Sequence, residues 1–151
     1  MIEEKLKQLG ITIPEAAKPL AAYIPALQVG NLVMTSGQVP IVDGVIKYQG
    51  KVGKDLSEDE GKEAAKLCAI NCLSALKSVM GSLDRIKRVL KLTVFVSSAS
   101  GLTAQPKVAN GASEFIVEVF GDSGKHVRSA VGVSELPLNS AVEIEMIVEV
   151  S

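Results

Sequence analysis

The chain has 151 residues, of which 47% are hydrophobic and 22% are charged, and its formal net charge at pH 7 is −1. This length predicts a single domain, 1–151, and the apolar content excludes a disordered chain. The near-zero charge argues against a general nucleic-acid binder. Without a signal peptide or an apolar run of about 18 residues, we expect a soluble cytoplasmic protein with no membrane contact.

Cysteine and histidine are scarce. The two cysteines, Cys68 and Cys72, are four residues apart, and His126 is the only histidine. A disulfide framework needs cysteines at longer spacing, and a zinc site needs further ligands. The sequence therefore predicts two reduced thiols that pack as small apolar groups, with no metal site.

The first third of the chain predicts a short helix and several strands. An amphipathic helix runs to about Gly10, and a proline-rich stretch follows, so 1–20 is expected to be an N-terminal extension. Two strands, 26–29 and 32–36, surround a turn at Gly30-Asn31. A third strand is expected at 45–48.

Two helices and three strands are expected in the remainder. Ser57 and Glu60 have the spacing of a capping box, which begins a helix that ends at Gly81. A second helix begins near Pro106 and ends at Gly121. Alternating apolar residues predict strands at 86–96, 127–133 and 142–150. The order βββ-α-β-α-ββ predicts an α+β domain with both helices on one face of a mixed sheet.

Arg128 is the first candidate for chemistry. On its strand face its neighbours are Ala130 and Gly132, which are small and would leave open space beside the guanidinium. Such a group could bind a ligand carboxylate through two parallel hydrogen bonds. An arginine that extends into solvent, or pairs with a surface glutamate, explains the same pattern.

Three further sites allow both a functional and a structural interpretation. Glu143 and Glu145 share one strand face, about 7 Å apart, either as an acid–base pair or as the polar face of the strand. Ser36-Gly37 ends a strand, where the glycine permits either close approach of a ligand or a tight turn. Asn110 is unfavourable inside a helix and should face solvent or make a polar contact.

Three blocks of sequence together resemble the reactive intermediate deaminase (RidA/YjgF) family. They are Gly30–Pro40, Lys91–Val96, and the V-R-S-A-V strand that continues through Leu136-Pro137 to the V-E-I-E strand at 142–145. The resemblance covers roughly residues 20–150. It implies a chorismate-mutase-like fold that assembles as a homotrimer with sites between subunits. It also implies hydrolysis of reactive 2-imino acids and enamines to 2-keto acids and ammonia, without a cofactor.

The resemblance assigns expected roles to individual positions. Arg128 would bind the substrate carboxylate, and Glu143 would help hold the attacking water. Gly37, with the adjacent Ser36, would contact the nitrogen end of the substrate. Three other residues match positions of the family's site. Tyr23 matches its tyrosine, Asn110 matches an asparagine in the second helix, and Ala130 stands two residues after the arginine. The family most often has cysteine where Ala130 stands, which indicates a divergent subgroup.

Two other functions compete with an imine deaminase. A non-catalytic trimer that binds small carboxylate metabolites would also need Arg128, whereas Glu143 favours catalysis. Ribonuclease activity would need a basic groove and aromatic stacking platforms. Aromatic residues make up 3% of the chain, so this hypothesis has little support.

Overall fold

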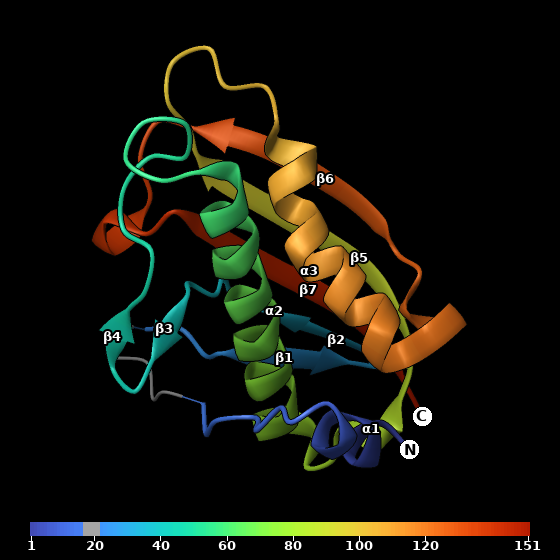
Figure 1. Cartoon of the computed structure of the whole chain (residues 1–151). Coiled ribbons are helices and arrows are strands. Elements are labelled where there is room, and N and C mark those ends of the chain that lie inside the picture. Colours follow the sequence, from blue (N-terminus) through green and yellow to red (C-terminus); the bar gives the residue numbers. More distant parts are fainter. Residues whose placement is uncertain (17–21) are drawn as a thin grey trace.

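The structure is a computed structural model that describes residues 1–16 and 22–151. Figure 1 shows how the helices and strands follow one another. The longer helices and the strands of the main sheet are α2 (Glu58–Met80), α3 (Gln105–Phe120), β1 (Ala26–Val29), β2 (Leu32–Thr35), β5 (Ile86–Ser97), β6 (Val127–Val133) and β7 (Val142–Val150). The shorter elements are α1 (Ile2–Gln8), β3 (Ile41–Val42), β4 (Val45–Ile46) and the 3-10 turns η1 (Leu83–Arg85), η2 (Gly121–Gly124) and η3 (Pro137–Asn139).

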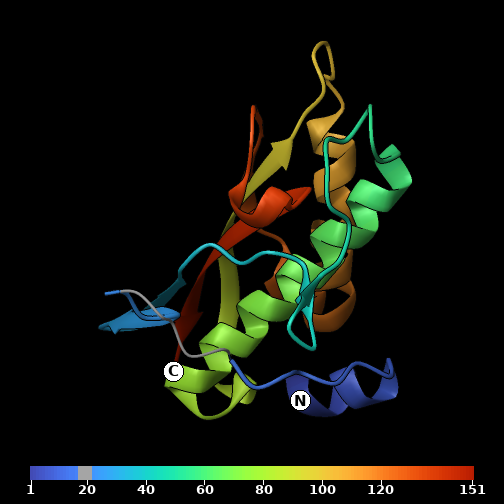
Figure 2. The same ribbon diagram turned by 90° about the vertical axis from the view of Figure 1, so that its left-hand side faces the viewer.

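Five strands form one mixed sheet in the order β1-β2-β7-β5-β6. Neighbouring strands are antiparallel except β5 and β6, which are parallel because α3 crosses between them. Both long helices lie on the same face of this sheet, and within residues 1–16 and 22–151 no α-helix covers the other face (Figure 2). The predicted α+β domain with two helices on one face of a mixed sheet is therefore confirmed.

The strand predicted at 45–48 is only partly present and does not join the main sheet. It is the two-residue β4, which pairs with β3 in a separate hairpin. The turn residues Asp43 and Gly44 have φ values of 50° and 78°, the left-handed pair that a two-residue hairpin turn requires. Tyr48 has a φ of 60°, which stops the extended backbone two residues earlier than expected.

The predicted boundaries of α2 are confirmed. Ser57 Oγ accepts from the Glu60 backbone N–H at 3.1 Å, and Glu60 Oε1 accepts from the Ser57 N–H at 3.0 Å. This reciprocal capping box satisfies two donors at the start of the helix. At the other end, Gly81 has a φ of 84°, which ends the helix in a conformation that glycine adopts freely.

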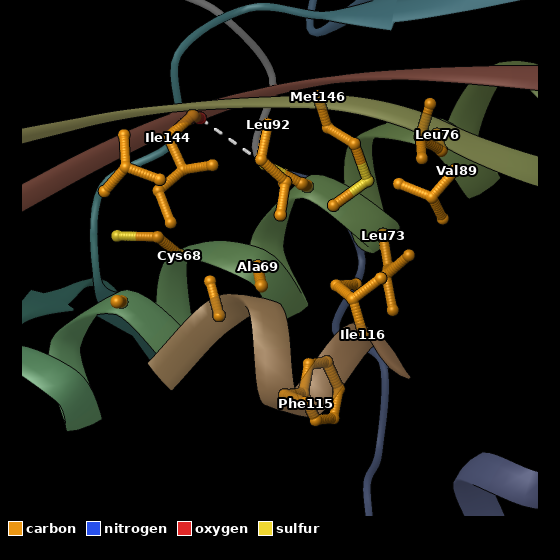
Figure 3. Packing of buried hydrophobic residues seen from close by; sticks show 14 of the residues in the cluster. Cys68, Ala69, Leu73, Leu76, Val89, Leu92, Phe115, Ile116, Ile144 and Met146 are labelled. Atoms are coloured by element: carbon orange, nitrogen blue, oxygen red, sulfur yellow. Dashed lines mark hydrogen bonds between the residues drawn. The ribbon is translucent and has the colours of Figure 1, made fainter. Parts of the chain in front are cut away.

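The core lies between the sheet and the two helices. Alternate residues of β7 are buried, as the period-two pattern predicted, and they point toward α2 and α3 together with Leu92 of β5 (Figure 3). Cys68 and Cys72 are free thiols within this core, as expected. The fully buried residues of β7 include Val142, Ile144, Met146 and Val148.

The N-terminal helix α1 is held against the end of α2. Leu6 is buried, and Glu3 forms an ion pair with Lys77 and accepts a hydrogen bond from Ser82 Oγ at 2.8 Å. These contacts hold the pKa of Glu3 below its usual value. Of the predicted extension 1–20, residues 17–20 lie outside the described residues.

Close packing of α3 on α2 depends on Gly111. A Cβ at this position would lie 2.7 Å from the carbonyl carbon of Lys62, so the two helices would have to separate. We expect Gly111→Ala to lower the free energy of unfolding by about 1–3 kcal/mol despite its better helix propensity. Urea unfolding followed by circular dichroism would measure this, with Glu118→Ala on the exposed side of α3 as the control. Equal stability of the two variants would contradict the prediction.

Candidate functional site

Arg128 is held by two side chains of α3. Its Nη1 donates to Asn110 Oδ1 at 2.9 Å and to Ser113 Oγ at 3.1 Å. The guanidinium thus neither extends freely into solvent nor pairs with a surface glutamate. Asn110 makes a polar contact, which accounts for an unfavourable residue in the middle of a helix. The structure brings Arg128 and Asn110 together, as the sequence analysis expected for one site.

The expectation of open space above the small residues of β6 is wrong at one position. A Cβ at Gly132 would lie 2.6 Å from Gln105 Nε2 and 2.9 Å from Ser98 Oγ, so the start of α3 fills the space beside this glycine. Ala130 is half-buried and packs against the core. Because these side chains are small, α3 can pack close to β6. Residues of α3 then accept the hydrogen bonds that Arg128 donates.

Gly37 and Glu143 form a second cluster, where the end of β2 meets β7. Gln38 and Ile144 exchange backbone hydrogen bonds of 2.8 and 2.9 Å, which fixes the two segments side by side. A Cβ at Gly37 would lie 2.9 Å from Glu143 Cδ, and its φ is not in the left-handed region. The glycine therefore makes room for the carboxyl group, and a tight turn is not the reason for it.

The electrostatic environment of Glu143 suits a proton acceptor. Glu143 is half-buried, and burial raises the pKa of its carboxyl, with a further contribution from the nearby Glu145 carboxylate. A raised pKa makes the ionised carboxylate a better base at neutral pH than an ordinary glutamate. The paired acids of β7 are therefore not equivalent, since Glu145 is exposed and Glu143 is not.

Ser36 is next to Gly37 in the chain, whereas Tyr23 lies on an exposed surface. Ser36 Oγ donates to the carbonyl of Ile24 at 2.6 Å, and its N–H donates to the carbonyl of Pro25 at 2.8 Å. The Ser36 hydroxyl thus ties the segment before β1 to the end of β2. Tyr23 is 58% exposed in the single chain, so its ring forms part of an open surface.

The two clusters lie on opposite faces of the sheet. Arg128 of β6 is the register partner of Leu92 of β5, and so both side chains lie on the same face of the sheet. Leu92 is fully buried beneath the helices (Figure 3). Glu143 pairs with Phe95, whose neighbours Val94 and Val96 are buried on the helix side, so Phe95 and Glu143 face the other way. Within one chain, Arg128 and Glu143 cannot contact the same small molecule.

Sequence reasoning missed two residues of the Arg128 cluster, Ser113 and His126. Ser113 Oγ is 2.9 Å from His126 Nε2, and His126 Nδ1 is 2.6 Å from the carbonyl oxygen of Gly124. Two signals could have found them: Ser113 is three residues after Asn110 on a helix, and His126 is two before Arg128 along an extended segment. Both spacings place residues on one face.

The two thiols of α2 form hydrogen bonds with the backbone of β7. Cys68 Sγ and Cys72 Sγ donate to the carbonyls of Val142 and Ile144, both at 3.4 Å, on either side of Glu143. Burial raises the pKa of Cys68 and raises that of Cys72 to about 12, so neither is a nucleophile at neutral pH. In the described ranges, no three His, Cys, Asp or Glu side chains gather closely enough to hold a metal ion.

One cavity of the structure lies away from both clusters. It has a volume of about 620 Å³ and is lined by the β3–β4 turn, by α2 and by residues of the 12–16 segment, and none of the predicted site residues lines it. Among the helices that the structure describes, none has the length and apolar character needed to cross a membrane.

Comparisons with known proteins identify the same family as the three sequence blocks did. The family model described as "YjgF/chorismate mutase-like, putative endoribonuclease" matches residues 3–150. The chain is 42% identical to Protein TCP17 of Trypanosoma cruzi over 151 residues, which is 99% of this chain and 94% of that protein. It is 30% identical over 138 residues to the 2-iminobutanoate/2-iminopropanoate deaminase of Dermatophagoides farinae, 91% of this chain and 93% of that one. A crystal structure from Shewanella oneidensis MR-1, described as a "putative endoribonuclease", has a TM-score of 0.95 at 35% identity and 99% coverage of both chains.

Proposed function

This chain belongs to the YjgF/chorismate mutase-like family, and on that premise we propose that it is a deaminase that hydrolyses reactive 2-imino acids and enamines to 2-keto acids and ammonia. The observation that carries the proposal is Arg128, whose guanidinium is fixed by Asn110 and Ser113 rather than by an acidic residue. Its charge is left for a ligand carboxylate. The printed name of the Dermatophagoides relative supports the choice of an imino acid as substrate.

The remaining residues fit a hydrolysis that needs little more than positioning. The carbon of a protonated imine is already electrophilic, so the protein has to orient the substrate and aim a water molecule. Arg128 binds the carboxylate, and the ionised Glu143 accepts a proton as the water oxygen bonds to the imine carbon. Glu143 passes this proton to the nitrogen and then accepts the proton of the new hydroxyl group as the C=O bond forms and the C–N bond breaks. Ammonia leaves, a 2-keto acid remains, and Glu143 gives up its proton to the ammonia. Gly37 lets the backbone approach the nitrogen end of the substrate.

This chemistry needs two copies of the chain. Because Arg128 and Glu143 face opposite sides of one sheet, one copy supplies the arginine and a neighbour supplies the glutamate. The helix-free face of the sheet also exposes apolar side chains that a second copy would cover. They are Leu27, Val29, Met34, Val127 and Val131. We place the sites between subunits of a homotrimer, the assembly implied by the family resemblance.

A mixed assembly tests both the reaction and the division of the site. Arg128→Ala and Glu143→Ala chains carrying different tags are coexpressed, and assemblies that contain both are purified in tandem. Each variant alone should be inactive, whereas every mixed trimer has one complete site of three and should show about a third of the wild-type turnover. Native mass spectrometry checks the composition. A mixed trimer as inactive as its parents would contradict the shared site.

A carboxylate-binding protein without catalysis is the second candidate. The Arg128 cluster is complete within one chain, so it could bind a 2-keto acid whether or not Glu143 acts as a base. The two functions differ in the behaviour of Glu143→Ala. For an enzyme, this variant should bind 2-oxobutanoate in a calorimeter about as well as the parent and lose only turnover. Absence of turnover in the parent, with 2-oxobutanoate bound, would favour the binding protein.

A further inference from the structure

A chain of hydrogen bonds links Arg128 to His126 through Ser113. Arg128 Nη1 lies 3.1 Å from Ser113 Oγ, and this oxygen lies 2.9 Å from His126 Nε2. On its other side, His126 Nδ1 lies 2.6 Å from the carbonyl oxygen of Gly124. The chain joins the end of η2, the start of β6 and the middle of α3.

The polarity of each link follows from the fixed groups at its two ends. The Gly124 carbonyl can only accept, so the proton of a neutral imidazole is on Nδ1, and Nε2 is an acceptor. Ser113 has one hydroxyl hydrogen, which it donates to Nε2. The lone pairs of Ser113 Oγ then face Nη1, which can only donate. Neutral His126 therefore keeps the Ser113 hydroxyl in the orientation that accepts from Arg128.

These contacts decide which edge of the guanidinium remains for a ligand. Asn110 Oδ1 accepts one hydrogen of Nη1 and Ser113 Oγ accepts the other. Within the described residues, Nε and Nη2 of Arg128 have no hydrogen-bond partner. Two parallel N–H groups on that edge match the two oxygens of a carboxylate. The α3 contacts thus hold the plane of the guanidinium and leave its binding edge unoccupied.

We propose that His126 is a positioning residue for Arg128: its neutral ring, acting through Ser113, orients the guanidinium toward the substrate carboxylate. The proposal rests on the proposed function only in taking Arg128 as the carboxylate ligand. Protonation of His126 would turn Nε2 into a donor, so the Ser113 hydrogen would have to turn away from the ring. Two cations would then share one hydroxyl oxygen, and the hold on Arg128 would weaken.

The surroundings of His126 favour the neutral ring. Burial lowers its pKa, and the positive charge of Arg128 lowers it further, against an opposing effect of the Gly124 carbonyl. Charged groups on the elements around the ring are Arg88 of β5, Asp122 and Lys125, which pair with each other, and Glu114 and Glu118 on the exposed side of α3. Among these and Arg128, it is Arg128 that shifts the pKa of His126. Both effects, burial and the charge of Arg128, favour the neutral ring over the protonated one.

The test compares KM with kcat for 2-iminobutanoate across pH 5.5–8.5, roughly a unit or more on each side of an ordinary histidine pKa. In the parent, KM should rise as the pH falls below the pKa of His126. His126→Gln keeps an amide near Nε2 and cannot be protonated, so its KM should lose this acid dependence. Ser113→Ala should raise KM about tenfold at pH 8, with a smaller change in kcat. Ser123→Ala is the matched control, since its hydroxyl donates to the carbonyl of Phe120 and does not reach Arg128.

Two different failures are distinguishable. If Ser113→Ala and His126→Gln both give the KM and pH profile of the parent while Arg128→Ala loses activity, the positioning role is wrong and the site stands. If Arg128→Ala also retains its KM, the carboxylate site itself is wrong. Circular dichroism and the elution volume of each variant establish that it is folded and assembled. Since His126→Gln retains hydrogen-bonding capacity, it tests the role even where alanine would disturb the local packing.

Discussion

Arg128→Ala is expected to lower kcat/KM for 2-imino acids by about 10²–10³-fold, because a charge-assisted contact to the substrate carboxylate is lost inside a partly buried site. Arg128→Lys should recover only part of this loss. A lysine ammonium has no planar fork, so it cannot use Asn110 and Ser113 to fix one edge while offering another to the ligand. The measurement is a coupled assay in which an amino-acid oxidase generates the imine, semicarbazide competes for it, and the protein diverts it to free keto acid.

The control for this experiment is a second arginine on the neighbouring strand. Arg88 is exposed, and its Nη2 donates to the carbonyl of Lys125 at 2.9 Å, so Arg88→Ala removes the same charge without touching the cluster. It should keep the activity of the parent. Arg128→Ala leaves Asn110 Oδ1 and Ser113 Oγ without a donor, which we expect to cost about 1 kcal/mol of stability. Activity that survives in folded Arg128→Ala would overturn the site assignment.

Glu143→Gln is expected to lower kcat by about 10²–10³-fold while leaving KM nearly unchanged, since the amide has the size of the carboxyl but cannot accept a proton from water. In the parent, kcat should rise with pH through the raised pKa of Glu143, because the ionised form is the base. The variant should lose this limb of the profile. Glu145→Gln, which changes the exposed acid two residues away, is the matched control and should behave like the parent.

The same substitution should not destabilise the protein at neutral pH. Folding raises the pKa of Glu143 above 4.5, so its ionisation is harder in the folded chain than in the unfolded one. The free energy of unfolding therefore decreases as pH rises from the unfolded pKa through the folded pKa. Because glutamine lacks this titration, Glu143→Gln should be relatively more stable at pH 7 than at pH 4. Thermal unfolding at the two pH values measures the difference, and a variant that is less stable only at pH 7 would contradict it.

The local elements of this fold are determined by the sequence. The capping box at Ser57 and the glycine at position 81 set the ends of α2, and the alternation along β7 set its buried face, because both signals depend on neighbouring residues alone. The short hairpin of β3 and β4 was harder to predict. Its turn chemistry is visible at Asp43-Gly44, but a two-residue strand has too few side chains to show a period, and local sequence does not tell which strands will pair.

For the candidate site too, some features could be predicted from the sequence and others depended on the tertiary structure. The sequence by itself marked Arg128 by its small neighbours and Asn110 by its place in a helix, whereas the family resemblance assigned roles to Glu143 and Gly37. Only the tertiary structure decided their grouping: α3 crosses the helix face of the sheet and meets Arg128, whereas the end of β2 meets Glu143. The physical reason is that strand alternation tells which residues share a face but not which face a helix will cover. That choice, made by long-range packing, places the two charges on opposite faces of the sheet, which is why we propose that a neighbouring copy completes the site.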